Sequence, residues 1–89
     1  MINNKKLYII KWIDSYTLGD YWQSIEDLDK PIDHVCISVG WIEKETKNNI
    51  VIIPHISDIN SKGKGMGCGI MTIPKVSILE RIKVNTKKL

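Results

Sequence analysis

The sequence predicts a mainly β protein that folds as one small, closed or nearly closed barrel of five strands. Isoleucine contributes 17 of the 89 residues, while alanine and phenylalanine are absent, and β-branched side chains favour strands. Short segments of alternating polarity recur between turns, as expected for a small barrel. A chain of 89 residues supports one compact core, so we expect residues 1–89 to form a single domain.

Five segments carry the pattern of strands, namely residues 7–14, 34–43, 50–56, 70–73 and 78–84. In the first segment Tyr8, Ile10 and Trp12 fall on one face. Gly40, in the second, fits a strand that bends sharply at a barrel corner. Pro54 marks an edge, a bulge or the end of the third.

The connections carry a short helical insert and a glycine-rich loop. Ser24 is a candidate cap for one or two helical turns that end before Pro31. Residues 57–69 form an expected flexible loop, with glycine at every second position from 63 to 69. Such a loop can cradle a phosphate with backbone N–H groups, but the sequence is no Walker motif and a strand follows it. Whether residues 62–69 contact a ligand stays open.

Charge and length limit the partners and the cellular compartment. The net charge is +3, and twelve of the thirteen basic residues are lysine, whereas a protein that reads nucleic acid usually carries more arginine. The apolar run 7–10 stops at Lys11, which is too short for a signal peptide or a membrane span. We therefore expect a cytoplasmic protein with reduced cysteines.

Neither a catalytic nor a metal site is expected. The serines lack a nucleophile-elbow context, so we predict a protein that is not an enzyme, without catalytic residues or cofactor. His34, Cys36, His55 and Cys68 have the chemistry of zinc ligands, but their spacings match no zinc motif. Both cysteines are better explained as small buried hydrophobic residues.

An aromatic segment is the best candidate for binding. Within eleven residues it holds Trp12, Tyr16, Tyr21 and Trp22, interleaved with Asp14, Ser15 and Asp20. Aromatic rings give nucleobases a stacking surface worth ~1–3 kcal/mol each, and carboxylates and hydroxyls can read base edges. Alternatively, the two tryptophans fill the end of a small core.

Four motifs in order resemble those of a large set of small phage-encoded proteins, over residues 8–84. They are Trp12-Ile13-Asp14-Ser15, the loop residues Gly19 and Trp22, Ser38-Val39-Gly40-Trp41, and Ile73-Pro74-Lys75 followed by Ile78. The second half also resembles an Sm-like or SH3-like barrel. One departure is visible: the usual Gly-Trp pair is split by Asp20 and Tyr21, which puts the place of Trp22 in question.

The resemblance implies a viral sponge protein that sequesters a cyclic-dinucleotide signal of the CBASS immune defence without cleaving it. It would act in the cytoplasm of the host bacterium as a homo-oligomer, with a pocket between protomers. The ligand-binding candidates that it implies are Trp12, Asp14, Ser15, Tyr16, Trp22, Pro74 and Lys75.

Two other functions stay open. A single-stranded RNA- or DNA-binding module would need a continuous basic groove and would bind less tightly as salt increases. A structural or protein-interaction subunit of the phage would expose apolar strand surface to a partner.

Overall fold

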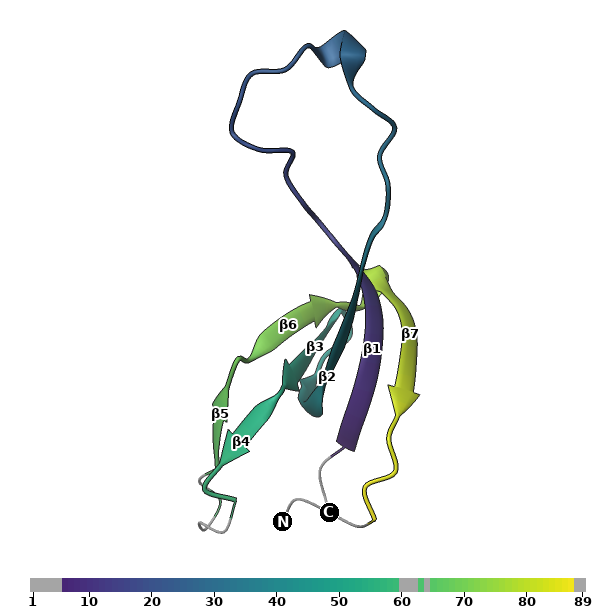
Figure 1. Cartoon of the computed structure of the whole chain (residues 1–89). Helices are drawn as coiled ribbons and strands as arrows, with labels where there is room; N and C mark the ends of the chain where they lie inside the picture. Colours follow the sequence, from purple (N-terminus) through teal and green to yellow (C-terminus); the bar gives the residue numbers. More distant parts are fainter. Residues whose placement is uncertain (1–5, 60–62, 64, 88–89) are drawn as a thin grey trace.

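The structure is a computed structural model that describes residues 6–59, 63 and 65–87, and it is built mainly from strands (Figure 1). In chain order the elements are β1 (Lys6–Asp14), the 3-10 turn η2 (Ile25–Asp27), β2 (His34–Glu45), β3 (Asn49–Ile53), β4 (His55–Ser57), β5 (Met66–Cys68), β6 (Met71–Pro74), the 3-10 turn η3 (Lys75–Ser77) and β7 (Ile78–Lys83). None of the helical turns in the described part of the chain is long and apolar enough to cross a membrane.

Five strands form one curved sheet in the order β6-β3-β2-β1-β7, and every neighbouring pair is antiparallel. Strands β4 and β5 form a separate two-stranded sheet. The edge strands β6 and β7 are not paired with each other. The mainly β prediction is therefore confirmed, whereas the sheets of the structure do not close into a barrel.

The concave face of the sheet carries the core. Its buried cluster consists of Ile10, Trp12, Ile50, Ile52 and Ile73. These side chains come from β1, β3 and β6. Because side chains alternate along a strand, buried residues two positions apart point to the same side of the sheet. Ladder pairing of Ile50 with Ile73 brings two of them together directly. The predicted shared face of Tyr8, Ile10 and Trp12 is the one that lines this core.

Strand β2 bends over β3 at Gly40. A Cβ added to this glycine would lie 2.7 Å from the carbonyl oxygen of Ile53 and 2.8 Å from Cγ1 of Ile52. The register between the two strands then shifts between Ile42 and Lys44. Gly40 thus lets the two backbones approach closely where the sheet curves, as the sequence predicted.

The convex face of the sheet is also apolar, but it is exposed. Val35, Ile37 and Val39 of β2 and Ile82 of β7 are all exposed on it. Ladder pairing aligns Val39 with Ile9 and Ile9 with Ile82, so the apolar residues form rows across three strands. We call these four exposed residues the outer apolar face.

Residues 15–33 leave the sheet between β1 and β2 as a long arm (Figure 1). The arm projects beyond the end of the sheet and carries η2 at its far end. Because of this projection, the molecule measures 57 × 24 × 24 Å. The helical insert that the sequence predicts is present only as the three-residue η2, and the Ser24 side chain makes no capping hydrogen bond.

Other expectations had mixed outcomes. The five predicted strands match β1, β2, β3, β6 and β7, and Pro54 separates β3 from β4. Within the expected flexible loop, Met66–Cys68 forms β5 instead, because it pairs with β4. Residues 60–62 and 64 of that loop lie outside the described residues.

The prediction of buried cysteines is wrong. Cys68, on the two-stranded sheet, is exposed, and Cys36 is only half-buried.

Replacing Gly40 with alanine is expected to destabilise the fold. The new methyl group must displace the Ile53 carbonyl oxygen, and overpacking of this kind costs about 1–3 kcal/mol. Gly65→Ala is the control, because its Cβ would be 3.6 Å from the nearest atom, the carbonyl oxygen of Ser57. Chemical denaturation measures both free energies of unfolding. Equal stabilities of the two variants would contradict this account of the bend.

Candidate functional site

The arm is fastened at its base by Tyr16. The Tyr16 hydroxyl donates to the carbonyl oxygen of Ile32 at 2.9 Å and accepts from the Ile32 N–H at 3.2 Å. The Tyr16 ring also meets the His34 ring edge-on, with centroids 5.6 Å apart. Just below, Asp14 and His34 form the last ladder pair of β1 and β2. Two strands and one aromatic clasp therefore hold both ends of the arm together.

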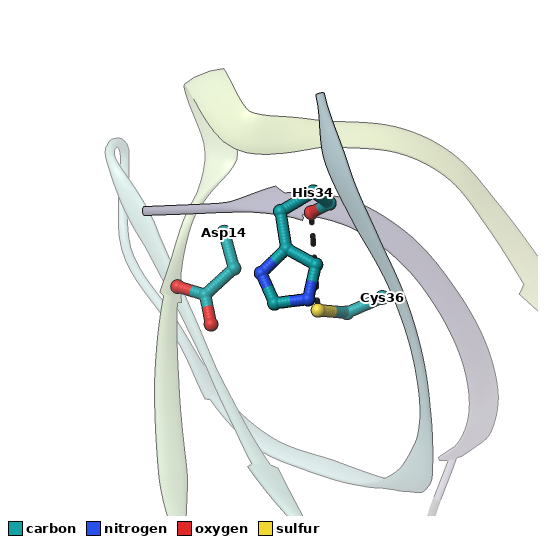
Figure 2. A group of neighbouring side chains, drawn as sticks. All are labelled: Asp14, His34 and Cys36. Carbon is teal, nitrogen blue, oxygen red and sulfur yellow. Dashed lines mark hydrogen bonds between the residues drawn. The ribbon is translucent and has the colours of Figure 1, made fainter. Parts of the chain in front are cut away.

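Three side chains with metal-binding and nucleophilic chemistry meet at this base. Asp14, His34 and Cys36 each offer one ligand atom, and these atoms lie within 4.8 Å of one another. Figure 2 shows the imidazole of His34 between the carboxylate of Asp14 and the thiol of Cys36. The Cys36 thiol makes a weak 3.9 Å contact with the His34 carbonyl oxygen. Oxygen, nitrogen and sulfur donors together form a mixed set that suits a borderline-soft divalent metal.

Trp12 serves the core. Its side chain is buried, and its indole N–H donates to the Ser38 hydroxyl on β2 at 3.0 Å. A buried indole usually needs such a partner. This contact supports the alternative in which Trp12 fills the end of the core. Ser38, in the Ser38-Val39-Gly40 motif, therefore has a structural role as the partner of the Trp12 indole.

The arm carries the exposed aromatic residues. Trp22 is fully exposed and Tyr21 is largely exposed. Gly19 has a positive φ of 108°, and a Cβ at this position would lie 2.7 Å from Cε1 of Tyr21. The Tyr21 ring therefore lies close to Gly19, and the Trp22 indole is fully exposed.

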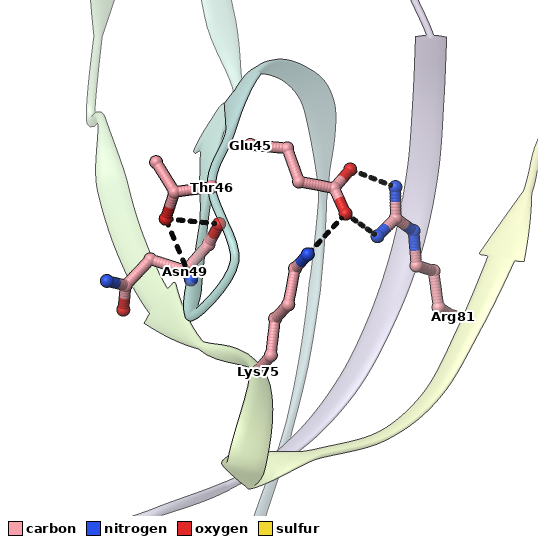
Figure 3. A network of polar contacts seen from close by, with 5 residues as sticks. All are labelled: Glu45, Thr46, Asn49, Lys75 and Arg81. Carbon is pink, nitrogen blue, oxygen red and sulfur yellow. Dashed lines mark hydrogen bonds and ion pairs between the residues drawn. The ribbon is translucent and has the colours of Figure 1, made fainter.

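Lys75 belongs to a network of charges that joins the end of β2 to η3 and β7. Its Nζ lies 2.7 Å from Oε2 of Glu45, and Arg81 reaches the same carboxylate through bonds of 2.8 and 3.1 Å (Figure 3). The hydrogen bond from Arg81, followed by that from Lys75, lowers the pKa of the Glu45 carboxyl from 4.5 to about 2. The Arg81 guanidinium also lies over the Tyr8 ring, 4.6 Å from its centroid.

The structure brings six of the seven predicted binding residues to one end of the sheet. Trp12, Asp14, Ser15 and Tyr16 follow the end of β1 into the arm. Ile78 pairs with Trp12, so Pro74 and Lys75, which come just before it, lie at the same end. Trp22 is the exception, because it stands on the arm. Pro74 and Lys75 are also structural here, since the Lys75 N–H donates to Asn48 and the Ser77 hydroxyl to Pro74.

Some residues at this end did not enter the predicted site. His34 and Cys36 were rejected as metal ligands because the chain spacing matched no motif, and their proximity to Asp14 comes from strand register. His55 and Cys68, the two other residues with the chemistry of zinc ligands, face each other in the ladder of β4 and β5, on the separate sheet. Glu45 and Arg81 are 36 residues apart, and no local pattern links them.

Comparison with known proteins yields no match: no family model, curated protein or solved structure matches the chain. The resemblance to phage proteins therefore rests on the motifs alone.

The Glu45 network predicts a specific loss of stability in acid. Because the pKa of Glu45 is lowered in the folded state, its contribution is fully present above pH 4.5 and disappears as the pH falls through about 2. In denaturant titrations, Glu45→Gln should therefore be less stable than the parent near neutral pH, and the difference should shrink in acid. Glu26→Gln, on the arm, is the control. A difference that does not change with pH would refute this role of the carboxylate.

Proposed function

We propose that this chain is a phage-encoded anti-defence protein that binds and sequesters a nucleotide immune signal, a cyclic dinucleotide such as cyclic GMP–AMP, without cleaving it. The site of action would be the cytoplasm of the host bacterium. The main support is Trp22, whose indole is fully exposed on an arm. An indole that packs on nothing in its own chain is well suited to stack on a planar base.

The end of the sheet at the base of the arm supplies the other groups that such a ligand needs. Asp14 and Ser15 offer polar atoms to base edges or ribose hydroxyls. Lys75 and Arg81 share the single carboxylate of Glu45, so this cluster carries one positive charge in excess. The phosphates would therefore lie at Lys75 rather than beside the acidic arm.

The proposal includes an Sm-like or SH3-like architecture. Five antiparallel strands in the order β6-β3-β2-β1-β7, with a 3-10 turn just before the last strand, support it. The Glu45 network supplies side-chain contacts across the open side, where no ladder closes the barrel. We place the ligand between the copies of a homo-oligomer, because Trp22 is fully exposed on the arm and a pocket between copies would enclose more of the ligand.

A second candidate is a structural or protein-interaction subunit, and the outer apolar face favours it. Val35, Ile37, Val39 and Ile82 expose apolar surface on one side of the sheet, and such patches mark interaction sites. A single-stranded nucleic-acid module receives less support. Residues 15–33 hold five acidic residues and one lysine, and this charge repels a phosphate backbone.

Calorimetric titration with a panel of cyclic dinucleotides tests the proposal. We expect one member to bind, and we expect Trp22→Ala to weaken binding by about 5- to 150-fold, since one stacked base is worth ~1–3 kcal/mol. Val76→Ala, an exposed apolar side chain in η3, is the control. The ligand should be recovered intact after heat denaturation. Cleaved ligand would indicate a nuclease, and failure of the whole panel to bind would refute sequestration.

A further inference from the structure

The chain exposes more surface than a folded monomer of its size should. A monomer of 10.2 kDa is expected to expose about 5,300 Å², whereas this chain exposes 7490 Å². Its radius of gyration is 17.3 Å, compared with about 12 Å for a compact domain of the same length. The excess area, roughly 2,200 Å², is greater than the ~800 Å² that each partner loses in an interface of standard size.

Two regions account for much of the exposed apolar surface. The first is the outer apolar face, on which Ile37 is 68% exposed. The second is the arm, where Ile25 is 84% exposed and Leu28 is 51% exposed. The exposed Ile37, Ile25 and Leu28 are large aliphatic side chains, and such side chains gain free energy when they leave water together.

The two regions differ in charge. Residues 15–33 contain five acidic residues and one lysine, for a net charge of −4. The rest of the chain, residues 1–14 and 34–89, contains twelve basic and five acidic residues, for a net charge of +7, and the two values add up to the +3 of the whole chain. An acidic arm and a basic body attract each other between copies and also guide their encounter.

We propose that the arm of one copy packs against the outer apolar face of a second copy. Ile25 and Leu28 at the far end of the arm bury their side chains against Val35, Ile37, Val39 and Ile82 of the partner copy. The Tyr16 hydroxyl bonds to Ile32 at the base of the arm, and the arm projects beyond the end of its own sheet (Figure 1). This contact rests on the homo-oligomer of the proposed function and names the surfaces that meet in it, and it forms whether or not a nucleotide is bound.

Light scattering coupled to size-exclusion chromatography tests this contact. The parent chain is expected to elute as a multiple of 10.2 kDa, and Ile37→Lys as a single chain with an unchanged circular-dichroism spectrum. Val76→Lys is the matched control: it puts the same charge on an apolar side chain that is 97% exposed in η3, outside the face, and should leave the mass unchanged. A monomeric parent, or an Ile37→Lys variant that still associates, would overturn the proposal.

Mixing two defective variants shows which surfaces meet. Ile37→Lys has a defective outer apolar face and an intact arm. Ile25→Asp combined with Leu28→Asp has a defective arm and an intact outer apolar face. If the arm of one copy packs on the face of another, the mixture retains one intact arm–face contact and should regain association. A contact between two faces or between two arms would show no such rescue. Trp22→Ala separates this proposal from nucleotide binding, because it should weaken ligand binding and leave association unchanged.

We also infer that Asp14, His34 and Cys36 form a divalent-metal site, with Zn²⁺ as the best-matched ion. Strand register rather than an exposed loop fixes these residues: Asp14 faces His34 across the ladder, and Cys36 follows two positions later on the same face. Their ligand atoms lie within 4.8 Å of one another. A bound ion would take one oxygen, one nitrogen and one sulfur from these residues, and a fourth tetrahedral position would be left to water.

Titration with Co²⁺ tests the metal site by a signal of its own. A thiolate-to-cobalt charge-transfer band should appear, disappear in Cys36→Ser and remain in Cys68→Ser, whose exposed thiol lies on the other sheet. Zn²⁺ should abolish the band by competition. His34→Gln should weaken metal binding at least about tenfold, within the range seen for loss of metal-site groups. A band that survives Cys36→Ser, or the absence of any band, would overturn the assignment.

Discussion

The concave face of one curved sheet supplies the main hydrophobic cluster of this small protein. Four isoleucines and Trp12 form the buried cluster, and the sheet can enclose them only because it curves. Curvature depends on Gly40, where β2 and β3 come too close together for a side chain. The Glu45 carboxylate at the end of β2 is ion-paired with Lys75 of η3 and with Arg81 of β7. Among the described residues, Val35, Ile37, Val39 and Ile82 on the convex face, and Ile25 and Leu28 on the arm, remain exposed.

The strands were predictable because alternation of polarity is a local signal. The breaks at Pro54 and the bend at Gly40 were equally local, since each depends on what one residue type allows. The strand β5 was missed, because Met66-Gly67-Cys68 has no alternation of its own and is ordered by pairing with β4. Which side of β2 faces the interior was also not visible, because both Ile37 and Ile42 are apolar and only the curvature of the finished sheet distinguishes them.

The candidate site was predictable only in part, for a related reason. Several residues of the recognised motifs stabilise the fold: Trp12 bonds to Ser38, Gly40 permits the bend, Ile73 is buried, and Lys75 pairs with Glu45. Motifs of this kind therefore report a shared architecture at least as much as a shared ligand. The meeting of Asp14, His34 and Cys36 depends on ladder register across a long insertion, which chain spacing does not reveal.

The two bonds between Tyr16 and Ile32 have an evolutionary consequence. They make the arm a tethered loop whose ends are held by the sheet, so that insertions, deletions and substitutions between residues 17 and 31 leave the ladder of β1 and β2 undisturbed. Loop-closure entropy rises only slowly with loop length, by about 0.6 kcal/mol for each doubling. The arm can therefore change in length and sequence while the framework beneath it stays the same.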